Sequence, residues 1–315
     1  MTSPDRDISE AIVTGASGFL GSRLVAHLAN QGIRVIAVSR RPSALTPGVT
    51  PVEADLLEAD GPGRALAELS GEPTRAVLFH LAGCAHVGWC EGNPLRAFEL
   101  NVLMAARVVD ASRRAGLRRI VFPSSAHVYS CPSPAPLDED DEIGGGSVYA
   151  TYKVAAESVL RGFATSFGMS CDIARLSNVY GAGASVDTVA GRVLQQAHDG
   201  GPLSVHTLLP VRDFVFIEDV VEGLIRLAML GGPPGFRVFN LSTGCGASVG
   251  ELLETVQRVS GVESRPPQAD HQVTSPTPWL VLSNRRLRER TSWVPAYTLE
   301  EGIRHSLHQR VAVAP

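Results

Sequence analysis

Residues 11–22 read AIVTGASGFLGS: a short β-branched strand, glycines at 15, 18 and 21, and the start of a helical pattern. In such a turn the first glycine permits the tight bend, the second lets a pyrophosphate approach the backbone, and the third lets the helix pack on the strand. The helix N-terminus adds unpaired N–H groups and a positive dipole end. This stretch predicts dinucleotide binding, although its spacing of three and three differs from the GxGxxG pattern.

The next strand, 34–38, ends in Ser39-Arg40-Arg41. An NAD site usually carries an acid about 20 residues beyond the glycines, where it binds the ribose 2′-hydroxyl. A hydroxyl and two guanidinium groups suit a 2′-phosphate instead, so the sequence favours NADP(H), with NAD(H) as the alternative. The two arginines could also be solvated loop charges. Residues 52–55 form a short third strand that ends in Asp55, a candidate contact for the adenine.

Strands alternate with helices through the first 180 residues. Further strands are expected at 76–83, 119–123 and 171–176, with long helices at 94–115 and 149–167. This alternation predicts an α/β fold with a doubly wound parallel Rossmann sheet, and ligands bind such sheets at the carboxyl ends of the strands. The glycine turn, the small residues after the 76–83 strand, the serines at 124–125 and the loop after 176 all fall there.

Lys153 is the only lysine among 28 basic residues. It follows Tyr149 by four positions, so the two side chains share a helix face. Lysine is a compact charge that guanidinium does not replace in tight catalytic geometry, so the pair is interpreted as an acid/base phenol with its charged partner. An ordinary surface contact is the alternative. Lowering the pKa of a free phenol from about 10 to near neutrality takes roughly 3 pKa units, which corresponds to about 4 kcal/mol.

Composition excludes several classes of protein. The 315 residues are 44% hydrophobic and carry a net charge of −4, which gives no reason to expect binding to nucleic acid or to a membrane surface. No apolar run is long enough to span a bilayer, and the polar N-terminus has no signal core. The five cysteines have no paired or zinc-like spacing, so we expect reduced thiols, no metal and a cytoplasmic location.

With these features in order, the sequence resembles the extended short-chain dehydrogenase/reductase (SDR) family, in its NAD(P)-dependent nucleotide-sugar epimerase/dehydratase/4-ketoreductase branch. The resemblance covers nearly the whole chain. It rests on TGASGFLG (14–21), FHLAG (79–83), SSAHVY (124–129), YATYK (149–153), RLSNVYG (175–181), VRDFVFIEDVV (211–221) and FNLSTG (239–244).

The resemblance implies roles for particular residues. Tyr149 would relay the proton, Lys153 would assist it and bind the nicotinamide ribose, and Ser125 would bind the reacting oxygen. The expected substrate-binding residues are His86, Ser124, Ser125, Asn178 and Arg212. The expected cofactor-binding residues are Gly15, Ser17, Gly18, Phe19, Leu20, Gly21, Ser39, Arg40, Arg41, Asp55, Leu56, Leu81, Ala82, Gly83, Asn101 and Lys153.

Three of these residues also have an alternative interpretation as purely structural residues. A lone histidine such as His86 is more often structural than catalytic. Asn178 could be a turn residue, and Arg212 could form a salt bridge with Asp213 or Glu218. Asn101 lies inside a predicted helix, where asparagine is unfavourable unless its side chain has a polar partner.

Several reactions remain open at this stage. A 4-ketoreductase of an NDP-4-keto-6-deoxyhexose that consumes NADPH is favoured by Ser39-Arg40-Arg41, and an NDP-hexose 4-epimerase with retained NAD is the alternative. A 4,6-dehydratase is disfavoured because Ala126 and His127 replace the acidic pair of that class. A carbonyl reductase without a nucleotide substrate and a non-enzymatic NADP sensor are the remaining readings. The segment 205–210 and the match near Arg265 depart from the family, which leaves base and sugar open.

The expected organisation is a cofactor domain of residues 1–180 with about 211–242, and a smaller C-terminal α/β substrate domain of about 181–210 with 243–315. The family also implies a homodimer through a four-helix bundle of the 94–115 and 149–167 helices. Leu95, Phe98, Val102, Val154 and Val159 are its candidate contacts, although the sheet also needs apolar helix faces.

Overall fold

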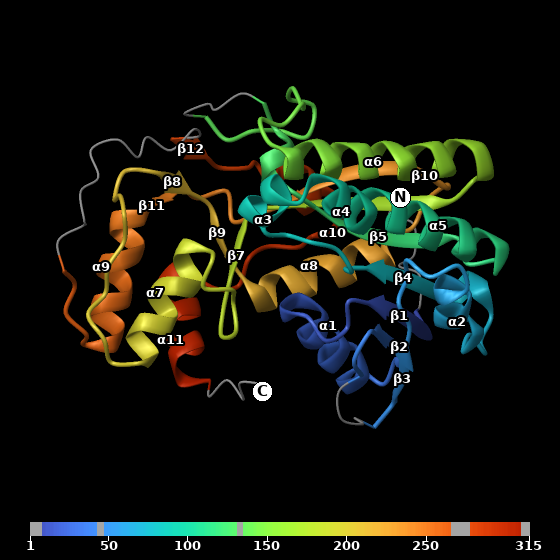
Figure 1. Ribbon diagram of the computed structural model, residues 1–315, viewed down its shortest axis with the longest axis horizontal. Helices are drawn as coiled ribbons and strands as arrows, with labels where there is room; N and C mark the ends of the chain where they lie inside the picture. Colours follow the sequence, from blue (N-terminus) through green and yellow to red (C-terminus); the bar gives the residue numbers. More distant parts are fainter. Residues whose placement is uncertain (1–7, 43–46, 131–134, 266–277, 310–315) are drawn as a thin grey trace. The chain divides into compact units, whose positions relative to one another are not determined.

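A computed structural model describes residues 8–42, 47–130, 135–265 and 278–309 of the chain. Its main feature is a seven-stranded parallel sheet in the order β10-β6-β5-β4-β1-β2-β3 (Figure 1), as the alternating pattern predicted. The strands are β1 (Glu10–Thr14), β2 (Arg34–Ser39), β3 (Val49–Glu53), β4 (Ala76–His80), β5 (Arg119–Ser125), β6 (Ser170–Leu176) and β10 (Gly235–Leu241).

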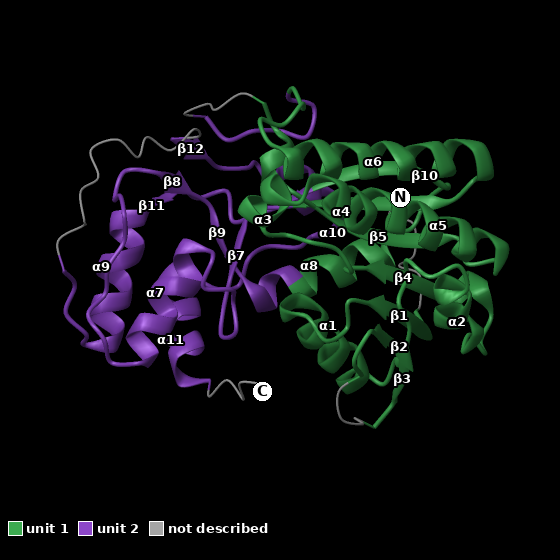
Figure 2. Ribbon diagram, in the orientation of Figure 1, with its two compact units in different colours: residues 1–130, 142–175, 221–239 green, residues 131–141, 176–220, 240–315 purple. Residues whose placement is uncertain are grey.

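The chain divides into two compact units (Figure 2). Unit 1 comprises residues 1–130, 142–175 and 221–239, and unit 2 comprises 131–141, 176–220 and 240–315. These boundaries differ from the predicted ones mainly at 131–141 and 211–220, which belong to unit 2. The assignment of cofactor and substrate to separate domains stays a prediction.

Helices of unit 1 cover the sheet with apolar side chains. These helices are α1 (Phe19–Asn30), α2 (Gly61–Ala67), α3 (Val87–Gly92), α4 (Pro94–Phe98), α5 (Met104–Arg114), α6 (Val148–Phe167) and most of α8 (Ile217–Met229). One buried cluster joins α2, α5 and α6 to β-strand residues such as Ile12, Leu78 and Ile120. That face of the sheet is therefore closed to solvent, as a parallel sheet requires.

The predicted helix at 149–167 is confirmed as α6. The Ser147 hydroxyl accepts a hydrogen bond from the Ala150 N–H at 3.1 Å, and the helix ends at Gly168 in the left-handed region at φ 60°. A serine cap and a glycine stop are the signals that such a boundary needs.

The predicted helix at 94–115 is instead α4, a π-helical turn at Glu99–Leu103, and α5. A π-helical turn widens the helix locally, and such turns occur frequently at functional sites. Asn101 lies in this turn, and its Oδ1 accepts a hydrogen bond from the Cys84 N–H at 3.0 Å. The expectation that this asparagine needs a polar partner is confirmed.

Unit 2 combines small sheets with helices. Its strands are β7 (Asn178–Tyr180) paired with β9 (Phe214–Phe216), and β8 (Val211–Arg212) between β11 (Ala247–Ser248) and β12 (Trp279–Leu280). Its helices are α7 (Val189–His198), α9 (Val249–Ser260), α10 (Arg285–Thr291) and α11 (Leu299–His308).

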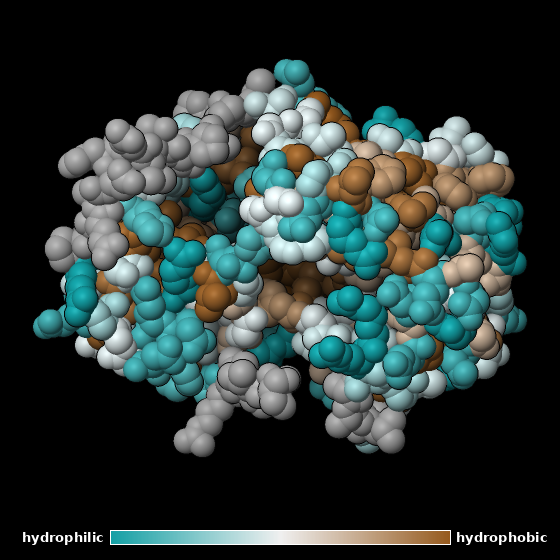
Figure 3. Space-filling view, in the orientation of Figure 1, coloured by the Kyte–Doolittle hydropathy of each residue, from teal (hydrophilic) through white to brown (hydrophobic). Residues whose placement is uncertain are grey.

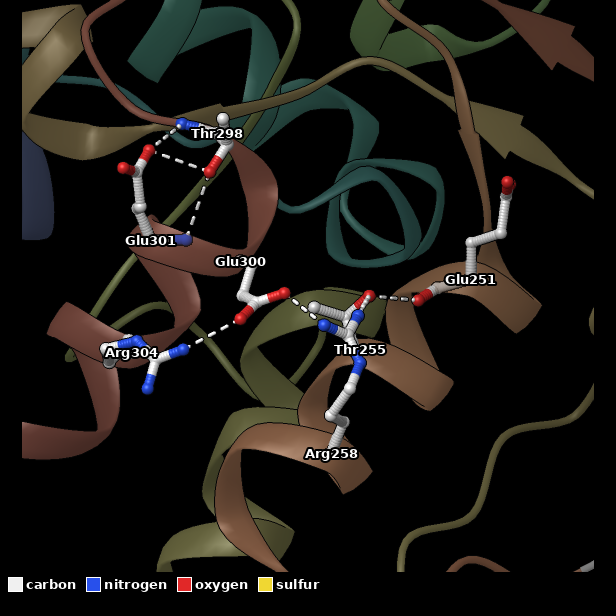
Figure 4. Close-up of polar contacts among 7 residues, drawn as sticks. All are labelled: Glu251, Thr255, Arg258, Thr298, Glu300, Glu301 and Arg304. Atoms are coloured by element: carbon white, nitrogen blue, oxygen red, sulfur yellow. Dashed lines mark hydrogen bonds and ion pairs between the residues drawn. The ribbon is translucent and has the colours of Figure 1, made fainter.

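Helices α9 and α11 are fixed by polar contacts at their surfaces (Figure 4). Thr298 and Glu301 form a capping box at the start of α11, and Arg258 of α9 pairs with Glu300 of α11. Arg304 contacts the same Glu300 at 2.7 Å. These contacts lie at the surface of unit 2, and none of them involves a residue expected to bind a ligand.

Candidate active site

The glycine turn between β1 and α1 leaves no space for side chains at two of its three glycines. Gly15 lies at φ +69°, and a Cβ there would stand 2.8 Å from the Ala82 nitrogen. A Cβ at Gly21 would stand 2.1 Å from the Gly15 carbonyl oxygen. No side chain caps α1 at Gly18, so the first N–H groups of the helix are open to an anion. This geometry fits the phosphates of a dinucleotide.

Asn101 and Gly83 meet at the end of β4. A Cβ at Gly83 would stand 2.9 Å from the Asn101 Oδ1, so only glycine admits this contact. The Asn101 side chain is 3% exposed, and its Nδ2 has no hydrogen-bond partner among the described residues. Because buried donors are rarely left unpaired, this orphaned N–H fits an acceptor atom on a bound nucleotide.

A pocket of about 470 Å³ lies where β2 and β3 end, and its walls include two of the residues expected at the adenosine. Its lining residues are Arg40, Glu53, Ala54, Asp55, Glu58 and Arg64. Three carboxylates therefore face two guanidinium groups, and Arg64 already pairs with Glu58 and with Asp60. Arg41 is exposed and does not line the pocket.

The structure brings Ser125, Tyr149 and Lys153 together at the carboxyl end of β5. Tyr149 is 5% exposed, and the nearby Ser125 hydroxyl acts to lower the pKa of its phenol. The Lys153 Nζ lies 5.9 Å from the centre of the Tyr149 ring and donates a hydrogen bond to the Pro123 carbonyl oxygen at 3.0 Å. A phenol, a hydroxyl and an ammonium group thus occupy one small region of unit 1.

The electrostatics of this trio differ from the expectation that Lys153 lowers the pKa of Tyr149. Burial raises the pKa of Tyr149 to about 12, and the Ser125 hydroxyl opposes that rise. Burial lowers the pKa of Lys153 to about 8, against the nearby Glu157 carboxylate. The difference arises because the ammonium group bonds to the Pro123 carbonyl rather than to the phenol, while the phenol is desolvated.

A buried ion pair behind the trio was missed from the sequence. The Arg175 guanidinium contacts both carboxylate oxygens of Glu157, at 3.2 and 2.9 Å, and each side chain is 2% exposed. The Ser124 hydroxyl donates to the same carboxylate at 2.5 Å. Two signals could have found this pair. Glu157 follows Lys153 by four residues on the same helix face, and Arg175 lies inside an otherwise buried strand.

The Glu157 contact gives Ser124 an internal partner. Successive residues of a strand face opposite sides, so Ser124 and Ser125 point apart. Ser124 is 4% exposed, and its contact with substrate stays a prediction.

The other tyrosines near α6 have structural neighbours. Tyr152 packs against Phe98 with ring centres 5.7 Å apart, on a different face of α6 from Lys153, and Tyr129 lies 4.9 Å from the Arg175 guanidinium. His86 caps α3, where its Nδ1 accepts a hydrogen bond from the Trp89 N–H at 2.7 Å. This cap accounts for the exposed histidine, and its contact with substrate stays a prediction.

Asn178 and Arg212 lie on neighbouring segments of unit 2. The Asn178 N–H donates to the Asp213 carbonyl oxygen at 2.9 Å, next to Arg212. The Asp213 carboxylate accepts hydrogen bonds from Ser177, Thr243 and Gly244. The salt-bridge alternative for Arg212 stays untested. The half-buried Arg212 has its pKa lowered by burial.

Unit 2 also contains a larger cavity of about 800 Å³. Its lining residues are Pro136, Thr243, Gly244, Cys245, Ser283, Asn284, Arg285, Arg288, Glu289, Ser292 and Val294. None of the residues expected to bind cofactor or substrate lies in it, so volume alone does not mark the site of chemistry. Arg265 is described, whereas the neighbouring residues 266–270 lie outside the described part of the chain.

Within the described ranges, no helix is both long and apolar enough to cross a membrane. Among the same residues, no group of three or more histidine, cysteine or acidic side chains is arranged to bind a metal.

Comparisons with known proteins agree with this architecture. The model of the NAD-dependent epimerase/dehydratase family matches residues 11–241. A UDP-glucose 4-epimerase of Mycolicibacterium smegmatis is 33% identical over 93% of this chain and 95% of its own length. A GDP-6-deoxy-D-mannose reductase of Pseudomonas aeruginosa is 28% identical over 93% of this chain and 94% of its own. The crystal structure of Thermus thermophilus UDP-glucose 4-epimerase in complex with NAD superposes with a TM-score of 0.82, at 26% identity, over 95% of this chain and 97% of that one.

Proposed function

The chain belongs to the NAD-dependent epimerase/dehydratase family, and from this premise we propose that it is a nucleotide-sugar 4-epimerase that retains NAD through the reaction. The observation that carries the proposal is the grouping of Tyr149, Ser125 and Lys153 at the carboxyl end of β5. The sequence alone favoured a 4-ketoreductase. The relatives named UDP-glucose 4-epimerase support the epimerase alternative better.

The trio accounts for proton movement at the sugar's 4-hydroxyl. Tyr149 takes the hydroxyl proton as the carbonyl forms and returns it when the carbonyl is reduced again. Ser125 donates a hydrogen bond to the same oxygen while negative charge develops on it. An oxidised nicotinamide beside Tyr149 would supply the carbon that accepts and returns the hydride, and the positive charge that brings the raised phenol pKa down.

The charges of the adenosine pocket support NAD over NADP. A ribose 2′-phosphate in that pocket would meet Glu53, Asp55 and Glu58, whereas Arg64 is already paired with carboxylates. Like charges at short range disfavour an added dianion. An unphosphorylated ribose needs only hydroxyl contacts, which the carboxylates supply.

We assign the substrate's diphosphate to Arg212 and Asn178 of unit 2. A guanidinium group binds phosphate oxygens in pairs, and the half-burial of Arg212 strengthens such a contact. The amide of Asn178 adds a neutral donor on the neighbouring segment. A screen of nucleotide sugars as substrates would identify the nucleobase and the sugar.

The second candidate is the NADPH-dependent 4-ketoreductase. Arg40 favours it, because this guanidinium lines the adenosine pocket and could pair with a 2′-phosphate. A reductase among the relatives also favours it.

The released cofactor separates the two candidates. Freshly purified protein is denatured, and the supernatant is analysed by ultraviolet absorbance and chromatography. An epimerase releases about one NAD per chain. Recovery of protein without nucleotide, together with NADPH consumption in the presence of a 4-keto-6-deoxyhexose nucleotide, establishes the reductase and rejects the epimerase.

We also propose a homodimer formed through α4 and α6. Apolar surface gathers over this part of unit 1 (Figure 3), and Leu95 and Phe98 of α4 are 82% and 42% exposed. Val102, an expected dimer contact, is 7% exposed within the unit's own core and is not a candidate. Light scattering should report twice the 33.4 kDa chain mass, and Leu95→Asp should shift it toward the monomer.

A further inference from the structure

A row of buried side chains crosses three neighbouring strands of unit 1. Thr14, His80 and Phe122 come from β1, β4 and β5, and each is at most 2% exposed. The Thr14 hydroxyl and the His80 Nδ1 are hydrogen-bonded at 2.8 Å, and the rings of His80 and Phe122 are stacked with their centres 5.9 Å apart. The proposed epimerase chemistry uses none of these three side chains.

The register of the sheet places His80 and Phe122 on the same face. The residues before them, Phe79 and Val121, are partners across β4 and β5, and side chains alternate between the two faces along each strand. Phe122 belongs to the apolar cluster that α6 closes over this face. Lys153 is a residue of that helix, so the row of rings runs toward the side chain of the lysine.

The ammonium group of Lys153 lies over the ring of Phe122. Its Nζ is 5.0 Å from the ring centre, within the roughly 6 Å over which an aromatic face attracts a cation. The same Nζ donates a hydrogen bond to the carbonyl oxygen of Pro123, the next residue of β5, at 3.0 Å. The Glu157 carboxylate, one turn further along α6, is already bonded to Arg175. Two close contacts of the ammonium group therefore come from consecutive residues of one strand.

We propose that Phe122 is a positioning residue for Lys153, and that the face of its ring keeps the buried ammonium group charged beside Tyr149. His80 supports the ring through their stacked contact. An aromatic face attracts a cation without adding a negative charge, whereas a carboxylate in its place would oppose a phenolate at Tyr149. The role in turnover rests on the proposed function, and the effect on the charge of Lys153 does not.

The charge of Lys153 depends on several opposing influences. The ionisable groups around it are Tyr149 and Glu157 of α6, His80 of β4, Cys84 after β4 and Cys90 of α3. Burial lowers the pKa of Lys153 to about 8, and the Glu157 carboxylate opposes that fall. Burial and the charge of Lys153 lower the pKa of His80 to about 3, so near neutral pH the imidazole adds no second positive charge. A contact that stabilises the ammonium form therefore shifts a group that titrates close to neutral pH.

Because Lys153 is the only lysine of the chain, its pKa can be measured directly. Full-length protein is labelled with carbon-13 lysine, purified without a lysine-containing tag and titrated by NMR. Phe122→Leu keeps an apolar side chain but removes the aromatic face, so the Lys153 pKa should fall by roughly one unit. Phe122→Tyr keeps the face and should keep the pKa. Trifluorophenylalanine at position 122 preserves the shape of the ring and weakens the negative potential of its face, so it should lower the pKa without a cavity.

Phe79→Leu is the matched control, because Phe79 is equally buried in β4 but lies on the opposite face of the sheet. It should reduce stability in urea and leave the Lys153 pKa unchanged. Turnover gives the second readout. If turnover needs the ammonium form, activity is lost as pH rises through the Lys153 pKa. The alkaline limb of kcat/KM should therefore move to lower pH in Phe122→Leu and stay at its wild-type position in Phe122→Tyr.

Three results would count against the proposal. An unchanged Lys153 pKa in the trifluorinated protein overturns it, and so does an equal fall in Phe79→Leu, because general loosening of the sheet would then be the cause. A lowered pKa with an unmoved alkaline limb rejects the role in turnover. Absence of turnover in the wild type would contradict the proposed function instead, while the titration, which needs no substrate, would still decide whether Phe122 stabilises the charge.

Discussion

The two ends of the proposed cofactor site in unit 1 are built in opposite ways. At the end of β5, the Ser124 hydroxyl, the Glu157 carboxylate and the Arg175 guanidinium form a closed network with almost no exposed surface. At the ends of β2 and β3, an open pocket mixes three carboxylates with two guanidinium groups. The buried end fixes one arrangement of charges, whereas the open end permits more than one cofactor. Under the proposed function, we expect substitutions at the two ends to affect turnover and cofactor preference separately.

The largest effect is expected at the buried end. Tyr149→Phe removes the proton-transferring hydroxyl and keeps the ring that packs against Cys90. We expect kcat to fall by roughly 10²–10⁴-fold, because that is the usual contribution of a positioned acid/base group. The measurement is steady-state turnover with a UDP-hexose, with circular dichroism as the check on folding. A variant that folds normally and keeps full turnover removes Tyr149 from the mechanism.

The next effect concerns the buried ion pair. Glu157→Gln leaves the Arg175 guanidinium buried without its counter-charge, and such a loss costs about 3–5 kcal/mol of unfolding free energy. Urea denaturation measures the change. Glu300→Gln, which weakens exposed contacts with Arg258 and Arg304, is the matched control and should change stability little. Equal stability of the two variants would contradict the contrast between buried and exposed pairs.

The Glu157→Gln substitution should also change the pH dependence of turnover. The Glu157 carboxylate raises the pKa of Lys153, which burial lowers to about 8. Removing the carboxylate should lower the Lys153 pKa further. If turnover needs the ammonium form, activity is lost as pH rises through that pKa, so the alkaline limb of kcat/KM moves to lower pH in Glu157→Gln. An unmoved limb would mean that Lys153 does not determine it.

The smallest effect is expected at the open pocket. Glu53→Gln removes one charge that opposes a 2′-phosphate, and Arg40→Ala removes the cation that could bind it. We expect the wild type to prefer NAD, the first variant to gain NADP affinity by roughly two- to fivefold, and the second to lose it by a similar factor. Calorimetric titration of cofactor-free protein measures both. Tight NADP binding that Arg40→Ala abolishes would favour the reductase.

The strongest sequence signals came from residues whose roles are local. The glycine spacing and the Tyr149–Lys153 spacing each lie within a few residues, so sequence order showed them. The Arg175–Glu157 pair was missed because it joins residues 18 apart on a strand and a helix. The contact between Asn101 and the Cys84 N–H was missed because Cys84 lies on another segment. Glu53 and Glu58 beside Arg40 could not be placed from sequence order, and the preference for NADP drawn from Ser39-Arg40-Arg41 stays a prediction.

The most direct test of the central claim is the interconversion of UDP-glucose and UDP-galactose by the purified protein with no cofactor added. Nucleotide sugars are separated by chromatography at successive times, and absorbance at 340 nm is followed in parallel. The account predicts that either sugar gives the same final mixture, without net accumulation of reduced cofactor. It also predicts that the Tyr149→Phe variant does not interconvert the two sugars. Failure to convert either sugar, with stoichiometric NADPH oxidation by a 4-keto-6-deoxyhexose nucleotide, would contradict it.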